Sequence, residues 1–239
     1  MVPMIEAEAS APEAPWAARL AVFDLETTGV DTHNDRIVTA FVGELDLTGT
    51  LVQGRHWLIN PGVPIPEGAT AVHGVTDEMA RNDGVDAATG VAEIAGLIGR
   101  LTVGGIPIAA FNGAFDFTLL DRECRRHGIE PPIPSLVIDP LIIDKQMDRY
   151  RRGKRTLEVT AAHYGVPLEG WHEAAADAAA AGRIAQALGR KHAELRVPAH
   201  ELHAQQEQWA AEQAESFAEW MRKGKNPDFV AERGWPVRD

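Results

Sequence analysis

The strongest constraint on the fold is the run Arg19-Leu-Ala-Val-Phe-Asp-Leu-Glu26. Its apolar residues predict a buried strand, and the following Thr27-Thr28-Gly29 predicts a turn. Asp24 and Glu26 are two residues apart, so both side chains point to the same face of the strand. Two carboxylates there repel each other and are costly to desolvate unless a cation lies between them. The run therefore allows a metal site, although paired acids also occur on solvent-facing strands.

Apolar patterns further along the chain predict two more strands, then alternating helices and strands. The turn residues 46–50 join the second and third strands, which favours an antiparallel meander. The whole order predicts an α/β fold, with a mixed sheet flanked by helices. The expected strands are 19–26, 36–45, 51–59, 106–111 and 136–138, and the expected helices are 84–101, 114–127, 140–147, 156–164, 173–189 and 198–222.

Three segments are expected from these patterns. Residues 1–17 are rich in proline with little apolar periodicity and predict a flexible arm. Residues 18–192 form the main domain. Residues 193–239 add a helix and a tail, and the aromatic residues Phe229 and Trp235 predict that the tail docks on the body.

Composition and charge narrow the class of protein. The 45% hydrophobic and 24% charged residues are typical of a globular protein. A transmembrane helix and a signal peptide are not expected, so we predict a cytoplasmic protein without a membrane partner. The single Cys124 cannot form an intramolecular disulfide or a cysteine zinc site. A net charge of −12 excludes a generally cationic nucleic-acid coat, but it permits an enzyme that binds nucleic acid locally.

Two further acids lie where helices are expected to begin. Asn112 and Asp116 lie where a strand passes into a helix. Asp116 could simply stabilise the helix dipole, and Asn112 could simply be the N-cap of the helix. Asp177 lies in an alanine-rich helix, whose small side chains leave room for a metal or another element. His172 precedes this helix on a loop, where a histidine is more often a surface or structural residue.

Together these segments resemble a known family. Asp24-Leu-Glu26-Thr-Thr-Gly29, Asn112-Gly-Ala-Phe-Asp116, and His172 followed by Asp177 resemble the three motifs of the DEDDh exonucleases of the DnaQ-like family. That family includes the proofreading epsilon subunit of bacterial DNA polymerase III. Val72-His73-Gly74-Val75-Thr76 is similar to the His-Gly element between its first two motifs. The resemblance covers residues 19 to 190.

The resemblance implies a ribonuclease H-like fold with a five-stranded mixed sheet. It implies hydrolysis of phosphodiesters from the 3′ end of DNA, with that end single-stranded or frayed, releasing nucleoside 5′-monophosphates. It also implies two divalent cations, Mg²⁺ or Mn²⁺, about 3.5–4 Å apart, which clamp the attacking and leaving oxygens. Hard oxygen ligands suit these cations.

The resemblance also implies roles for individual residues. Asp24, Glu26 and Asp177 would hold the metal that carries the attacking water, and Asp24 would bridge to a second metal near Asp116. His172 would be the general base, because a pKa near 6.5 suits proton transfer near neutral pH. The residues that fall where the family lines the pocket for the terminal nucleotide are Thr27, His73, Asn112 and Phe115.

A basic run lies between two expected helices, with five cations in the segment 149–155. It is either a solvated loop or a strip that contacts phosphates independently of sequence. We favour the second interpretation and expect Arg151, Arg152 and Arg155 to bind substrate.

Two other functions remain open at this stage. An exoribonuclease resembling RNase T or oligoribonuclease shares the same acids and histidine, although Asp24-Leu-Glu26-Thr-Thr-Gly29 looks more like the proofreading branch. A catalytically silent binding module is the second alternative, and the intact acids argue against it. The C-terminal helix could contact a DNA polymerase or a second copy of the chain.

Overall fold

A six-stranded sheet runs through the computed structural model, which describes residues 14–168 and 173–239. Its strand order is β4-β3-β2-β1-β5-β6. The first three strands form the expected antiparallel meander, whereas β5 lies parallel to β1 and β6 parallel to β5. The strands are β1 (Arg19–Thr27), β2 (Ile37–Asp46), β3 (Leu51–Asn60), β4 (Val85–Asp86), β5 (Ile108–Ala109) and β6 (Val137–Ile138).

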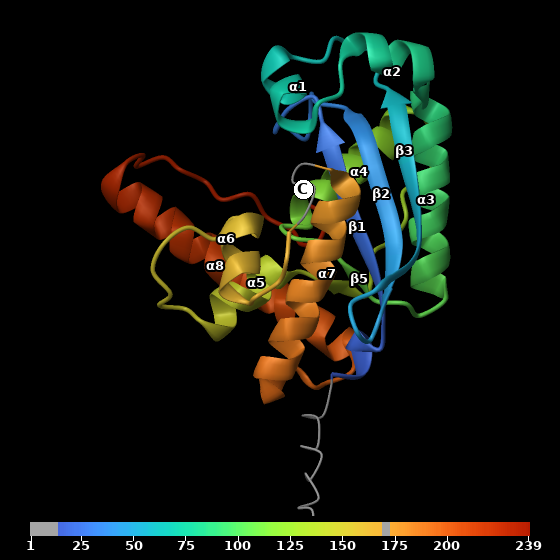
Figure 1. The fold of residues 1–239 in the computed structure, drawn as a ribbon. Helices are drawn as coiled ribbons and strands as arrows, with labels where there is room; N and C mark the ends of the chain where they lie inside the picture. Colours follow the sequence, from blue (N-terminus) through green and yellow to red (C-terminus); the bar gives the residue numbers. More distant parts are fainter. Residues whose placement is uncertain (1–13, 169–172) are drawn as a thin grey trace, which may run out of the picture.

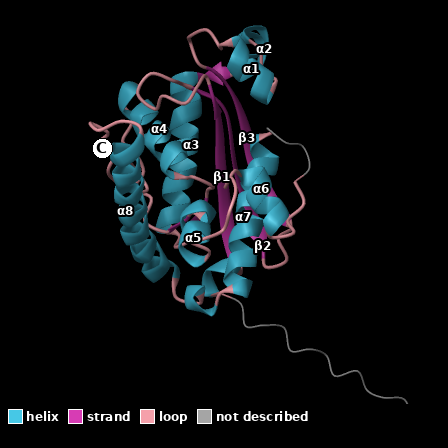
Figure 2. Cartoon of the chain, turned by 90° about the vertical axis from the view of Figure 1, so that its left-hand side faces the viewer, coloured by secondary structure: helices cyan, strands magenta, loops and turns pink. Residues whose placement is uncertain are grey.

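This mixed sheet flanked by helices confirms the predicted fold class. The sheet has one strand more than the five expected, because the two-residue β4 pairs parallel with the end of β3. Figure 2 shows helices on both faces of the sheet. The helices are α1 (Glu67–His73), α2 (Asp77–Asp83), α3 (Ala87–Val103), α4 (Ala114–Arg126), α5 (Pro140–Met147), α6 (Leu157–His163), α7 (Ala174–Lys191) and α8 (Ala199–Gly224), with short 3₁₀ turns at Pro15–Ala17 and Ala193–Leu195.

Two large apolar cores, one on each face of the sheet, hold these layers together, and a smaller cluster that includes Val38 and Ala80 lies beside α2. One lies between the sheet and α3 and α4, and includes Phe23 and Ile94. The other lies on the opposite face, where Val22 and Leu45 pack against α7. A Cβ at Gly182 of α7 would come within 2.5 Å of the Val22 side chain, so the glycine lets the helix approach the sheet closely. This close packing determines how near the start of α7 comes to the end of β1.

The N-terminal segment is more ordered than expected from residue 14 onwards. Trp16 is buried, and its indole nitrogen donates a hydrogen bond to the carbonyl of Leu195 at 2.9 Å. Residues 14–17 therefore pack against the body instead of belonging to a flexible arm. The rest of the expected arm, residues 1–13, lies outside the described residues.

Helix α8 covers the edge of the sheet at β6. The Gln206 side chain accepts a hydrogen bond from the amide of Asp139 at 2.6 Å and donates one to the carbonyl of Val137 at 2.9 Å. His203, one turn earlier, accepts from the amide of Val137 at 3.1 Å. Side chains of α8 thus satisfy backbone groups that an open edge strand would expose.

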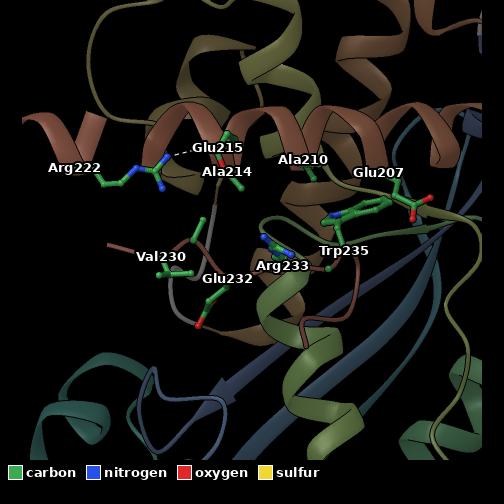
Figure 3. Close-up of a pocket in the computed structure, with 12 residues that line it drawn as sticks. Glu207, Ala210, Ala214, Glu215, Arg222, Val230, Glu232, Arg233 and Trp235 are labelled. Atoms are coloured by element: carbon green, nitrogen blue, oxygen red, sulfur yellow. Dashed lines mark hydrogen bonds and ion pairs between the residues drawn. The ribbon is translucent and has the colours of Figure 1, made fainter. Parts of the chain in front are cut away.

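The C-terminal tail runs back from α8 to α4. The amide of Arg238 donates to the hydroxyl of Thr118 at 2.9 Å, and Arg122 donates to the carbonyl of Asp239 at 2.9 Å. Figure 3 shows Trp235 and Arg233 of this tail facing α8, and a cavity of about 410 Å³ lies between the tail and the helix. Trp235 is buried and joins the core on the α4 side.

Candidate active site

The acids of the first motif lie near the carboxyl end of β1. Asp24 and Glu26 share one face of the strand, as predicted, while Phe23 and Leu25 belong to the core on the other face. After Glu26 the pairing with β2 shifts by a residue at Thr27, and the strand ends. Thr27 donates a hydrogen bond from its hydroxyl to the carbonyl of Gly29 at 2.5 Å, which folds the chain back after the strand.

Helix α7 brings the third acid to this strand end. Asp177 lies in the first turn of α7, where the helix dipole favours a negative charge. Figure 1 shows the start of α7 beside the arrowhead end of β1. One carboxylate oxygen from each of Asp24, Glu26 and Asp177 lies within 4.8 Å of the other two. Three oxygens at such separations can hold a hard divalent cation.

Asp116 reaches the cluster from the start of α4. This side chain is buried, and its Oδ1 accepts a hydrogen bond from the amide of Leu25 at 3.1 Å. Leu25 lies between the two acids of β1, so the bond holds the second motif against the first. Asp24 and Asp116 are close enough for the charge of Asp116 to raise the pKa of Asp24.

The electrostatics of the cluster favour a cation. Burial and then the neighbouring acids Asp116, Glu26 and Asp177 raise the pKa of Asp24 well above its ordinary value. Burial and then the charge of Asp177 raise the pKa of Glu26 to about 7. Burial also raises the pKa of Asp116. Without a cation the carboxylates thus tend to hold protons, and a divalent ion would replace those protons.

Asn112 and Phe115 surround the junction between β5 and α4. Asn112 adopts a left-handed conformation with φ of 60°, which asparagine tolerates better than most residues. Its carbonyl accepts a hydrogen bond from the amide of Phe115 at 2.9 Å. Asn112 is exposed and Phe115 is partly buried. Phe115 directly precedes Asp116 in α4, and Asn112 lies four residues before that acid.

An acid that the sequence analysis missed holds this junction in place. Asp139, at the end of β6, accepts hydrogen bonds from the amides of Asn112 and Gly113, both at 3.0 Å. It also caps α5 by accepting from the amide of Leu141 at 2.9 Å. Burial raises its pKa to about 6. The sequence Asp139-Pro140 predicts an N-cap followed by proline at the first position of a helix. It does not predict the hydrogen bonds from the amides of Asn112 and Gly113, which belong to a loop distant in the sequence.

His73 is the last residue of α1. This helix lies beyond the end of the sheet at which β1 and β3 end (Figure 1). The Nδ1 of His73 accepts a hydrogen bond from the amide of Val75 at 3.1 Å. His172 lies outside the described residues, because the structure describes nothing between residues 168 and 173. The described part of the chain thus contains the four predicted acids and the four predicted pocket residues.

The basic run divides into two groups. Arg151 and Arg155 are largely buried and form ion pairs with the fully buried Asp144, at 2.6 Å between Arg151 Nη2 and Asp144 Oδ2. Burial alone would raise the pKa of Asp144, but these pairs outweigh it and hold that pKa below its ordinary value. Arg152 is exposed, as are Arg149 and Lys154. Of the three arginines expected to bind substrate, two therefore have a structural partner.

Comparison with known proteins identifies the family. The model of the RNase_T family, described as an exonuclease, matches residues 21–185. The chain belongs to this exonuclease family. The matched region of this exonuclease domain contains all four acids, and the match confirms the family expected from the three motifs. It ends before α8 begins.

Relatives of this exonuclease domain include proteins named as DNA polymerase III or as a subunit-like protein of it. The chain is 29% identical over 179 residues to DNA polymerase III PolC-type from Lacticaseibacillus paracasei, covering 75% of this chain and 12% of the relative. It is 37% identical over 105 residues to a DNA polymerase III subunit epsilon-like protein from Rhodobacter capsulatus, covering 43% of this chain and 14% of the relative. The chain spans about an eighth of the length of these relatives.

Solved structures of exonuclease I share the fold. One matches with a TM-score of 0.64 at 20% identity, covering 75% of this chain and 42% of that chain. Another, E. coli exonuclease I with a dT13 oligonucleotide, matches with a TM-score of 0.59 at 21% identity, covering 71% of this chain and 40% of that chain. In the described part of the chain, no helix is both long and apolar enough to cross a membrane.

Proposed function

We propose that the protein is a 3′–5′ exonuclease that hydrolyses DNA with the help of two divalent metal ions. The observation that carries this proposal is the convergence of Asp24, Glu26 and Asp177, whose oxygens lie within 4.8 Å of one another. Such a cluster raises the pKa of its own members and is costly to a protein that does not bind a cation there. A silent binding module has no physical need for it.

The residues fit divalent cations that prefer oxygen ligands. Asp24, Glu26 and Asp177 would hold one ion, and Asp24 together with Asp116 would hold the second. Bound there, Mg²⁺ or Mn²⁺ supplies positive charge that stabilises the attacking and leaving oxygens of a phosphoryl group. Among the solved structures that share the fold is a zinc-bound form of the E. coli exonuclease I complex with single-stranded DNA, which supports cation binding at such a fold.

His172 is proposed as the general base. It would accept a proton from the water that attacks the last phosphorus atom, because a neutral imidazole accepts protons near neutral pH. The bond between phosphorus and the 3′ oxygen then breaks, so the shortened strand keeps a 3′ hydroxyl and the product keeps a 5′ phosphate. Thr27, His73, Asn112 and Phe115 would line the pocket for that terminal nucleotide.

DNA is proposed as the substrate because the relatives are named as parts of DNA polymerase III. Those names also suggest a polymerase as a partner for the exonuclease domain. RNA shares the phosphodiester chemistry, and the four acids do not distinguish the two polymers.

The test is a time course on 5′-labelled DNA and RNA oligonucleotides of one sequence, with Mg²⁺, Mn²⁺ or EDTA. We expect a ladder that shortens from the 3′ end with either metal and no cleavage in EDTA. His172→Ala and Asp24→Asn should each abolish the ladder, whereas Arg100→Ala, an exposed change on α3, should leave it unchanged. Cleavage that persists in Asp24→Asn would contradict the proposal. Faster cleavage of RNA would move the assignment to an exoribonuclease.

A further inference from the structure

The second half of α8 leaves two large aromatic side chains exposed. Phe217 and Trp220 are 51% and 53% exposed, and their rings stack at 5.8 Å between centroids. Phe229 of the tail meets Phe217 edge-on at 5.5 Å. On the first half of the same helix, by contrast, Leu202 is buried. An exposed aromatic pair next to a groove is typical of a binding surface.

Two adjoining hollows connect this aromatic pair with Asn112, on the loop before Asp116. The first, of about 460 Å³, begins at Asn112 and Asp139 and extends between α5, α8 and the tail. The second, of about 480 Å³, extends to Arg149 and Trp220. Both are lined by Lys145, Gln213 and Phe217. A continuous groove, here called the α8 groove, therefore leads from the loop before Asp116 to the end of α8.

The α8 groove combines these aromatic rings with cations. Lys145 lines both hollows and Arg149 lines the outer one. Lys225 lies over the Trp220 ring, with its Nζ 5.0 Å from the centroid. Beyond Arg149 the loop carries further exposed residues, namely Tyr150, Arg152 and Lys154.

Among the described residues three acids line the groove, and two of them have partners. Glu232 pairs with Arg238 at 2.6 Å, and the Asp139 carboxylate accepts three backbone hydrogen bonds. Glu212 lines the outer hollow. The outer hollow is thus lined by the two cations Lys145 and Arg149 and by one acid. In a chain with a net charge of −12, this local positive charge beside the aromatic pair favours an anionic ligand.

We propose that the α8 groove binds a single strand of nucleic acid upstream of its 3′ end. Unpaired bases stack on Phe217 and Trp220, and phosphates pass near Lys145 and Arg149. A single strand fits this mixture because its bases expose their faces, which a duplex hides. The inference rests on the proposed exonuclease function, since the strand must leave the carboxylate cluster along some surface. The groove depends on α8, which lies outside the region that matches the family.

The test measures how hydrolysis by the full chain depends on substrate length. KM for oligo(dT) of 3 and 20 nucleotides is compared between the wild type and the double variant Phe217→Leu, Trp220→Leu, which keeps apolar bulk but removes the rings. We expect KM for the 20-mer to rise about tenfold or more, and KM for the trimer to change less than about twofold. Trp220→Phe should retain most of the length dependence. Arg149→Ala should weaken binding of the 20-mer and lower its salt dependence, whereas the matched control Arg100→Ala should not.

Three outcomes would overturn the inference. The first is a length dependence that the double variant leaves unchanged, and the second is a KM that rises equally for both substrates. The third is self-association, measured by light scattering, that the double variant abolishes while KM stays the same, since the groove would then be a contact between chains. Fluorescence anisotropy of labelled dT20 in EDTA separates this inference from the proposed function. If the wild type cleaves nothing, weaker dT20 binding by the double variant would still support the groove.

Discussion

The backbone amide of Leu25 donates a hydrogen bond to the carboxylate of Asp116, with 3.1 Å between the nitrogen and Oδ1. Ninety-one positions separate the two residues, and Leu25 lies between Asp24 and Glu26. Burial raises the pKa of Asp116, and the amide opposes that rise because it stabilises the charged form. This bond therefore fixes a buried acid next to the acids that repel it.

Replacing Asp24 with asparagine should separate stability from activity. Asp24→Asn keeps the shape of the side chain and removes a charge that its neighbours oppose. In EDTA at pH 8 we expect the melting temperature to rise, by about 2–4 °C for each kcal/mol gained in a chain of this size. Hydrolysis should fall by about a thousandfold or more. Thermal melts with and without Mg²⁺, beside activity measurements, check both effects.

The same melts give the contradicting outcome for Asp24. In the wild type, Mg²⁺ should raise the melting temperature, because it binds the folded state. An equal rise in Asp24→Asn would mean that Mg²⁺ binds elsewhere. Asp35→Asn is a suitable control, since Asp35 accepts hydrogen bonds in the turn after β1 but does not belong to the cluster of three carboxylates.

The metal-free protein should lose stability as pH rises through the window set by Glu26. Burial and the charge of Asp177 raise its pKa from 4.5 to about 7 in the folded state. Between these values the folded state binds more protons than the unfolded state, so the free energy of unfolding falls as pH rises from about 5 to about 7. Apparent Mg²⁺ affinity should increase over the same range, because the cation displaces the proton.

Urea denaturation in EDTA at a series of pH values measures this effect. His203 contributes in the opposite direction, because burial lowers its pKa and its folded state gains stability as pH rises. The difference between wild type and Glu26→Gln therefore removes the contribution of His203 and leaves that of the Glu26 carboxylate, including its effect on the pKa values of Asp24 and Asp116. The expectation fails if that difference is independent of pH between 5 and 7, or if it has the opposite sign.

Much of the fold follows from local patterns in the sequence. The apolar run ending at Glu26 predicts β1 to within a residue, and the alanine-rich run containing Asp177 predicts α7 to within two residues at either end. Long helices and strands with one buried face show a clear periodicity of apolar residues in the sequence. Helix α1 was missed because the structure buries none of its residues, so its sequence shows no apolar period.

Tertiary partners are what the sequence does not reveal. Arg151 and Arg155 belong to a run that looks like a solvated or phosphate-binding loop, yet both pair with Asp144. Asp139 looks like the cap of a single helix, yet it also holds the loop around Asn112. In each case the sequence around the residue would look the same if the distant residue that it contacts were absent. The acids of the candidate site were proposed from the sequence because three segments together resemble the motifs of a known family.

Asp139 should position the active site by holding the loop before Asp116. Asp139→Ala leaves the buried amide of Gly113 without its acceptor, and an unsatisfied group of this kind costs about 1–3 kcal/mol. We expect kcat to fall about tenfold or more, because the loop that leads to Asp116 loosens. Asp139→Asn keeps one acceptor oxygen and should lie between Ala and wild type. Unfolding free energies and kcat at saturating substrate measure both effects.

A loss of stability alone would not establish positioning. Asp86→Ala removes the side chain that caps α3 through the amide of Thr89, at the other edge of the sheet. It should cost about 1 kcal/mol and leave kcat unchanged. If Asp139→Ala likewise lowers stability but retains full kcat, Asp139 has a structural role and the positioning role is wrong.

The two groups of arginines between α5 and α6 should respond differently to replacement by alanine. Arg155→Ala removes one partner of the fully buried Asp144, and breaking a buried ion pair costs about 3–5 kcal/mol. Arg151 and the Tyr164 hydroxyl still contact that carboxylate, so we expect a loss near the lower end of this range. Arg152→Ala, on an exposed side chain, should change stability by less than about 0.5 kcal/mol. Urea denaturation of the two variants measures this contrast.

The salt dependence of single-strand binding completes the comparison. If Arg152 contacts a phosphate, its replacement should reduce the slope of log K against log salt by about 0.7. Arg155→Ala should leave the slope unchanged wherever it remains folded. Adding Asp144→Asn to Arg155→Ala should recover part of the lost stability, because the unpaired buried charge is then gone. A stable Arg155→Ala variant with a reduced slope would instead return Arg155 to the phosphate-binding strip that the sequence predicts.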